Sequence, residues 1–184
     1  ETIAIRYYGE LADGNNEMLV GATLVGFFNT VLSANVTPIN ARGLAKERGV
    51  EVIESRSSRP RNFTNLISVK LHTSDGERWA EGAVFEQAGP RLVLFDGVTV
   101  EAPLDGTLVV IRNNNQPGVI GEVGTVLGRH QINIATFALG HGPTGAVAVV
   151  KIDGSDGSEQ PVTDDVLGEI RAVEAVQQAA VVTL

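Results

Sequence analysis

The sequence contains no cysteine, which excludes a disulfide framework, a thiolate zinc site and a cysteine-ligated iron–sulfur cluster within it. Basic residues are also scarce: 14 Lys and Arg stand against 22 Asp and Glu, and the net charge is −8. That charge, with aromatic residues at only 5%, disfavours nucleic acid as a partner, including recognition of RNA bases on an aromatic sheet. No apolar run reaches bilayer length without a polar residue, and residues 1–8 have a strand pattern rather than a leader pattern. We therefore expect a cytoplasmic protein without a membrane partner.

Groups that carry out catalysis are missing as well. No Gly-x-Gly-x-x-Gly motif follows a strand, and no Ser-His-Asp or Cys-His set stands out in the sequence. The three histidines, His72, His130 and His141, are scattered and fit a strand face, a helix end and a loop better than a metal site. The sequence thus predicts neither a catalytic residue nor a metal site in this chain.

Residues 105–184 show strand and helix patterns in a definite order. An apolar strand precedes a helix with apolar residues from Val119 to Leu127 on one face. Two alternating strands follow, then a helix that Thr163 can cap, then a last strand. The expected strands cover 107–112, 132–137, 146–152 and 175–184. This order predicts a ferredoxin-like βαββαβ domain with both helices on one face of the sheet.

A polar loop, residues 113–118, opens the first helix of this half. Pro117 suits the first helical turn, where a missing N–H costs nothing, and Asn115 or Gln116 can offer a side-chain oxygen to the free N–H groups. The N–H groups and the positive end of the helix dipole suit the carboxylate of a small polar ligand. On the residues alone a simpler interpretation stays open, in which Asn115 only caps the helix and Asn133 only ends a strand.

Two motifs together resemble the ACT domain, a regulatory module that binds amino acids. The first motif runs from Asn115 to Gly121, and the second is Gln131-Ile132-Asn133-Ile134. Both are similar to the motifs of the ACT domain in the phosphoglycerate dehydrogenase family. The resemblance implies a site for L-serine or a similar small amino acid. It also implies that Asn133 reaches the ligand from a neighbouring subunit, so we expect a homo-oligomer. The effector-binding residues implied in this way are Asn113, where relatives usually have His or Tyr, Asn115, Pro117, Gly118, Val119 and Asn133.

Residues 1–104 have a different α+β pattern. A strand ends at Gly9, an apolar helix is expected from Met18 to about Ala34, and a second helix starts at Thr37-Pro38 and ends at Gly49. Strands are then expected at 50–55, 66–73, 78–86, 92–95 and 98–102, with a hairpin signal at Asp96-Gly97. We therefore predict an α+β protein of two domains, residues 1–104 and 105–184.

The segment from Val36 to Gly49 resembles the allosteric substrate-binding domain that precedes ACT in the long, type-I form of the same family. That resemblance implies a basic site for a phosphate-bearing or polycarboxylate anion. The residues assigned to it are Arg91, with Lys151 approaching from the ACT side and Arg59 and Arg61 from the loop 55–62. On charge alone, the arginine loop fits equally a solvated loop paired with acidic neighbours.

The family resemblance implies that these residues are the C-terminal regulatory part of an NAD-dependent dehydrogenase of serine biosynthesis. Catalytic residues and NAD would then belong to upstream domains of the same chain, and the start at Glu1 rather than Met agrees with this expectation. Two alternatives stay open: the regulatory chain of an iron–sulfur L-serine dehydratase, and a free-standing amino-acid sensor.

Overall fold

The computed structural model describes residues 1–184 except 33–34, 60, 144 and 154–161. Spatial contacts divide the chain into two compact units, Glu1–Ala83 and Val84–Leu184. Within the described ranges no helix is long and apolar enough to cross a bilayer. The α+β class predicted from the sequence is confirmed, because each unit packs helices on a mostly antiparallel sheet.

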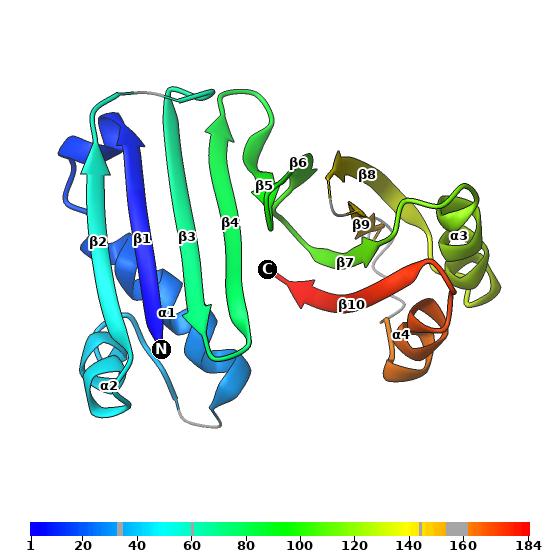
Figure 1. The fold of residues 1–184 in the computed structure, drawn as a ribbon, viewed down its shortest axis with the longest axis horizontal. Helices are drawn as coiled ribbons and strands as arrows, with labels where there is room; N and C mark the ends of the chain where they lie inside the picture. The colour runs from blue at the N-terminus through cyan, green and yellow to red at the C-terminus, as the bar shows by residue number, and fades with distance from the viewer. Residues whose placement is uncertain (33–34, 60, 144, 154–161) are drawn as a thin grey trace. The chain divides into compact units, whose positions relative to one another are not determined.

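The first unit is a sheet with two helices on one face (Figure 1). Its strands follow the order β2-β1-β3-β4. β1 and β2 are parallel, as expected for strands joined through helices, whereas β1–β3 and β3–β4 are antiparallel. The elements are β1 (Thr2–Gly9), the 3₁₀ turn η1 (Glu10–Asp13), α1 (Glu17–Val31), α2 (Ala41–Glu47), β2 (Glu51–Ser57), β3 (Asn65–Thr73) and β4 (Gly76–Phe85).

Alternation along β1 decides which face the helices cover. Ile3, Ile5 and Tyr7 are buried and pack against Val20 and Leu24 of α1. The intervening side chains of β1 therefore lie on the opposite face of the sheet.

The two helices of this unit differ from the predicted ranges at their ends. α1 ends at Val31, and the predicted end at Ala34 lies outside the described residues. α2 begins at Ala41 rather than at Thr37, so the predicted start is wrong. A single turn precedes the helix: the Thr37 N–H donates to the Asn40 Oδ1 at 2.8 Å, and the Ala41 N–H donates to the Thr37 carbonyl at 3.0 Å.

Tyr7 gives this unit a testable pH dependence. Its hydroxyl donates to the Glu54 Oε2 at 3.4 Å, and burial together with that carboxylate raises the pKa of Tyr7 to about 12 from 10.0. A raised pKa in the folded state stabilises the fold fully below pH 10.0 and loses that contribution as the pH rises to about 12.

We expect wild-type protein to lose thermal stability more steeply than Tyr7→Phe across this alkaline range. Absorbance of tyrosinate follows the titration, and Tyr8→Phe assigns the signal because the chain has only 2 tyrosines. Parallel stability curves for wild type and Tyr7→Phe would contradict the assignment.

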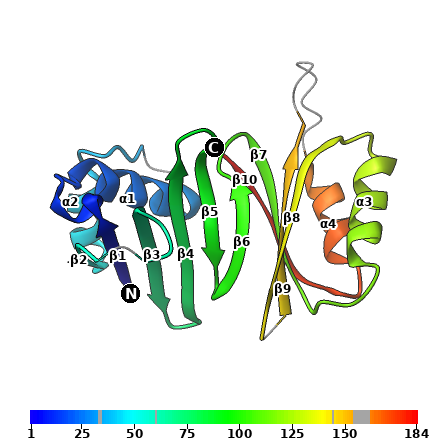
Figure 2. The same cartoon turned by 90° about the horizontal axis from the view of Figure 1, so that it is seen from above.

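The second unit begins with the antiparallel hairpin β5 (Gly89–Phe95) and β6 (Val98–Pro103). A four-stranded antiparallel sheet in the order β10-β7-β9-β8 follows, with α3 and α4 on one face (Figure 2). This arrangement is the predicted ferredoxin-like topology. Its elements are β7 (Thr107–Asn113), α3 (Val119–Arg129), β8 (Ile134–Gly142), β9 (Gly145–Ile152), α4 (Asp164–Arg171) and β10 (Val176–Thr183).

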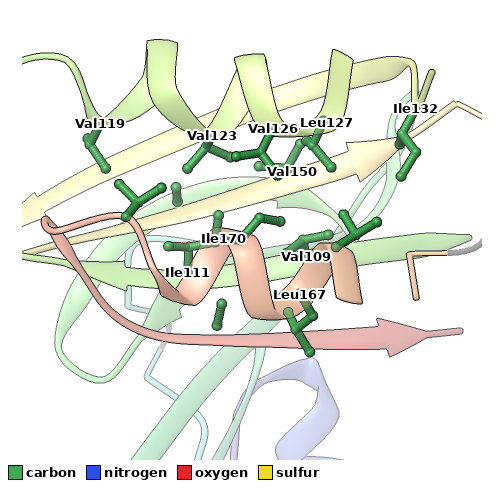
Figure 3. Close-up of a cluster of buried hydrophobic side chains, with 14 of the residues drawn as sticks. Val109, Ile111, Val119, Val123, Val126, Leu127, Ile132, Val150, Leu167 and Ile170 are labelled. Atoms are coloured by element: carbon green, nitrogen blue, oxygen red, sulfur yellow. The ribbon is translucent and has the colours of Figure 1, made fainter. Parts of the chain in front are cut away.

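The core of this sheet lies between its strands and the two helices. Val109 and Ile111 of β7 face Val123 and Leu127 of α3 and Ile170 of α4 (Figure 3). Each of these five side chains is at most 1% exposed. At the start of α4, Thr163 is the N-cap, as predicted, and its hydroxyl accepts from the Val166 N–H at 3.4 Å.

The other face of the sheet is covered by β6. A Cβ at Gly140 of β8 would lie 2.1 Å from the Thr99 carbonyl oxygen, and one at Gly142 would lie 2.7 Å from Val98 Cγ2. A side chain at Gly140 would have to displace the backbone of β6, and one at Gly142 would have to displace the Val98 side chain. This packing places β5 and β6 with the second unit in space, although their sequence pattern continues that of the first. The boundary between sequence modules after residue 104 stays a prediction.

Candidate functional site

The loop between β7 and α3 has an unusual backbone conformation. Asn115 has a φ of 58° and Gly118 a φ of 97°, both in the left-handed region. The Asn115 N–H donates to the Asn113 Oδ1 at 2.9 Å, and the Asn114 N–H donates to the Ala175 carbonyl at 3.0 Å. The loop is thus fixed to the end of the sheet at two successive residues.

Among the described residues, no side chain caps the first turn of α3. Gly118 is its N-cap residue. The prediction that Pro117 lies inside the first turn is wrong, because the helix begins at Val119 and the left-handed Gly118 separates the two. Asn115, Pro117 and Gly118 are exposed, while Val119 enters the core. Free N–H groups at an accessible helix start suit an anionic group such as a carboxylate.

Asn133 follows the other end of the same helix. The Gln131 N–H donates to the Gly128 carbonyl and the Ile132 N–H to the Leu127 carbonyl, with Gln131 at a φ of 57°. This is a Schellman termination, and it delays β8 to Ile134 rather than the predicted Ile132. Asn133 is exposed, and its carbonyl accepts from the Asp153 N–H at 2.9 Å.

One chain does not bring Asn115 and Asn133 together. The two residues flank α3, which has 11 residues. A helix of that length spans about 16 Å, several times the reach of a small amino acid. A ligand that contacts both side chains must therefore take them from two chains.

An open groove of about 760 Å³ runs between α3 and α4 beside this loop. It is lined by the N-cap residue Gly118 and, along α3, by Gly121, Glu122 and Arg129. Glu169 of α4 accepts from Arg129 at 3.1 Å and pairs with His130 Nε2 at 2.8 Å. These contacts tie the end of α3 to α4 and neutralise that part of the groove.

The arginines of the loop 55–62 lie in the first unit. Arg61 donates to Glu81 at 2.6 Å, and the Glu81 side chain is only 5% exposed. The Tyr8 ring lies 5.2 Å from the Arg61 guanidinium and 5.0 Å from that of Arg6. Arg59 is exposed, and Pro60 beside it lies outside the described residues.

Sequence reasoning missed Tyr8, Arg6 and Glu81 as neighbours of this loop. The alternation of β1 could have placed Arg6 and Tyr8 on the face away from the helices. Glu81 had no such signal, because its contact with Arg61 depends on where the loop folds over β4.

Arg91 and Lys151 lie in the second unit. Arg91 faces Pro103 across the β5–β6 hairpin, and its buried Nε has no hydrogen-bond partner within the described part of the chain. Lys151 donates to Asp105 at 2.6 Å, and its side chain is 26% exposed. Asp105 closely follows Pro103, so both cations lie near the end of β6. Because Arg59 and Arg61 belong to the other unit, a single anion site made by all four stays a prediction.

Other kinds of site find no support in the described ranges. No group of three His, Cys, Asp or Glu side chains there is placed to hold a metal ion. The features that remain are an accessible left-handed loop at a helix start, an exposed asparagine after that helix, and a guanidinium with an unpaired buried nitrogen. They describe an α+β protein whose ferredoxin-like domain exposes a polar loop at the start of a helix.

Comparison with known families agrees with this class. Residues 1–96 match the family model described as the D-3-phosphoglycerate dehydrogenase intervening domain, and residues 107–175 match that of the ACT domain. The chain belongs to the D-3-phosphoglycerate dehydrogenase family, and it corresponds to the regulatory part of that family.

Three proteins with similar sequences are each named D-3-phosphoglycerate dehydrogenase. The D-3-phosphoglycerate dehydrogenase of Bacillus subtilis is 35% identical over 83% of this chain, which covers 29% of that protein. Those of Synechocystis sp. and Mycobacterium leprae are 28% and 32% identical over 100% of this chain, covering 33% and 34% of their lengths. The chain thus spans about a third of the length of the curated relatives it matches.

Proposed function

We propose that the second unit binds L-serine, or a close small amino acid, as a feedback effector of a phosphoglycerate dehydrogenase. One observation carries the proposal: the loop before α3 presents the exposed Asn115 beside a helix start that no side chain of the described residues caps. The match of residues 107–175 to the ACT domain supports the same ligand class.

The chemistry of the loop suits a zwitterion. The N–H groups that follow Pro117 and Gly118 lie at the start of α3. A carboxylate bound there is stabilised by these donors and by the positive end of the helix dipole. The amide of Asn115 can accept from an ammonium and donate to a hydroxyl, and Asn133 supplies the same two polarities. Val119 anchors the turn in the core and fixes where these groups lie.

The separation of Asn115 and Asn133 along α3 makes the proposed site a two-chain site. We therefore propose a homo-oligomer in which the loop of one chain faces the start of β8 in another. β8 is an edge strand of its sheet, and pairing it with a second copy would also satisfy its open hydrogen-bonding edge. Effector bound across such a seam stabilises the paired form by its differential affinity.

Calorimetric titration of the chain with L-serine, glycine and phosphoserine tests this proposal. We expect saturable binding of serine, weaker binding of glycine because it lacks the hydroxyl, and no gain from the phosphate of phosphoserine. Absence of heat with all three ligands, in protein that light scattering shows to be oligomeric, would contradict it.

We further propose that Arg91 holds a phosphate-bearing or polycarboxylate anion, with weaker contributions from Lys151, Arg59 and Arg61. The supporting observation is the buried Nε of Arg91, which has no acceptor in the described part of the chain, since a buried guanidinium N–H ordinarily has one. Lys151 and Arg61 already have carboxylate partners, so each would have to share its charge between that partner and the anion.

Phosphate and citrate at low ionic strength should raise the melting temperature of wild-type protein, and Arg91→Ala should remove most of that gain. Arg91→Lys keeps the charge but loses the two-point geometry of the guanidinium, so we expect an intermediate shift. Arg48→Ala is the control, because Arg48 is an exposed residue of the first unit and its substitution removes the same charge. An equal shift in Arg91→Ala and Arg48→Ala would exclude a specific site.

For the whole protein we propose NAD-dependent oxidation of 3-phosphoglycerate, the first step of L-serine biosynthesis, in the cytoplasm. NAD and the catalytic residues would belong to upstream domains of the same chain, and the names of the relatives support this activity. Two alternatives, the regulatory chain of an iron–sulfur L-serine dehydratase and a free-standing sensor, imply a different coding sequence upstream of this chain. The coding sequence upstream decides among the three: it encodes a dinucleotide-binding fold, a dehydratase, or neither.

A further inference from the structure

We infer that Asn113 is a positioning residue of the loop, acting through Asn115 instead of touching the effector. The inference rests on the proposed amino-acid function of this loop. The Asn113 side chain is part of a residue that is only 1% exposed, in contrast to the exposed Asn115. Its Oδ1 accepts the Asn115 N–H at 2.9 Å.

That hydrogen bond fixes the orientation of the amide. Only the oxygen of the Asn113 side chain can accept from an N–H, so Nδ2 must point the other way. Nδ2 is buried and has no partner among the described residues. The amide therefore offers no exposed atom to a ligand that arrives from solvent.

The hydrogen bond that Asn113 accepts also accounts for the backbone conformation of Asn115. An asparagine oxygen bound to the N–H two residues later is an Asx-turn, which replaces a backbone turn. Asn115 has a φ of 58°, a left-handed conformation that asparagine adopts more readily than most other residues except glycine. The hydrogen bond from the Asn115 N–H to Asn113 stabilises this conformation and thereby directs the Asn115 side chain.

The consequence concerns recognition. The effector would contact Asn115, the N–H groups at the start of α3 and the Asn133 of a second chain. Asn113 determines whether Asn115 is in place, and so it sets affinity without a contact of its own.

A double-mutant cycle separates positioning from contact. Asn113→Leu, a substitution of similar size without an acceptor, should weaken L-serine binding about tenfold in wild-type background. In an Asn115→Ala background the same substitution should change affinity by less than about twofold, because the side chain that it positions is gone. Losses that multiply independently would show that Asn113 contacts the ligand and would overturn the inference.

Hydrogen exchange of the Asn115 amide gives a readout without ligand. Asn113→Leu should speed that exchange by about tenfold or more, whereas Asn113→Asp keeps an acceptor oxygen and should keep exchange slow. Asn114→Ala is the matched control, since Asn114 is exposed and holds the sheet through its backbone. Slow exchange of core amides such as that of Val109 verifies that each variant is folded.

The two readouts separate this inference from the proposed function. If wild-type protein binds no amino acid but the exchange pattern holds, the effector proposal fails and the positioning role stands. If Asn115 exchanges equally fast in Asn113→Leu and Asn113→Asp, or equally slowly in Asn113→Leu and wild type, the positioning role is wrong.

Discussion

Asn115→Ala protein and Asn133→Ala protein should each lose L-serine binding by about ten- to a hundredfold, because each leaves a polar group of the bound ligand without its partner. When the two proteins are mixed and their subunits exchange, about a quarter of the sites should regain wild-type affinity. The mixed dimer contains one site with both asparagines intact and one with neither. Calorimetry of the mixture measures the recovered fraction directly.

The recovery depends on the geometry of α3. Asn115 precedes this helix and Asn133 follows it, so one chain cannot present both side chains to a ligand as small as serine. Native mass spectrometry verifies that mixed dimers have formed. If they form and no binding returns, the two-chain site is wrong, and Asn114→Ala shows whether any change in the loop suffices to abolish binding.

A second large effect is expected from Gly140→Ala. A Cβ at this position would lie 2.1 Å from the Thr99 carbonyl oxygen, closer than two such atoms can approach. The substitution must push β6 away from β8, and we expect a loss of about 1–3 kcal/mol in the free energy of unfolding. Urea denaturation measures the loss, and faster hydrogen exchange in β6 would locate it.

Gly128→Ala is the matched control for that experiment. Gly128 lies in α3 with nothing within 4 Å of a built Cβ, so alanine should leave stability unchanged or raise it by up to about 1 kcal/mol. Equal stability of Gly140→Ala and Gly128→Ala would mean that β6 does not pack on this face in solution.

Periodicity determined the order of the elements in the second unit. A helix face with apolar residues every three or four positions and strands that alternate can bury their apolar sides in few ways. The βαββαβ order followed from residues 107–184 for this reason, and so did the cap by Thr163 and the hairpin at Asp96-Gly97. In each case the chemistry that decides is local, such as the left-handed φ of 47° at Asp96 and 82° at Gly97.

The starts of α2 and α3 were predicted less well than the order of the elements. Asn40 holds the segment after Thr37 in a turn, and Gly118 moves the start of α3 past Pro117. Both residues are compatible with a helix boundary at several positions. The choice among those positions depends on which backbone groups find partners once the chain has folded.

Only the tertiary structure decided what surrounds the candidate residues. The family resemblance implied a ligand contact for both Asn113 and Asn115, yet folding buries the first and exposes the second. Arg61 and Glu81 are distant in sequence and meet at 2.6 Å, whereas the buried Nε of Arg91 has no partner among the residues that the structure describes. Burial and pairing of this kind arise from contacts between distant segments, which local propensity does not encode. Motif and periodicity already determine the fold class and the position of the polar loop before α3.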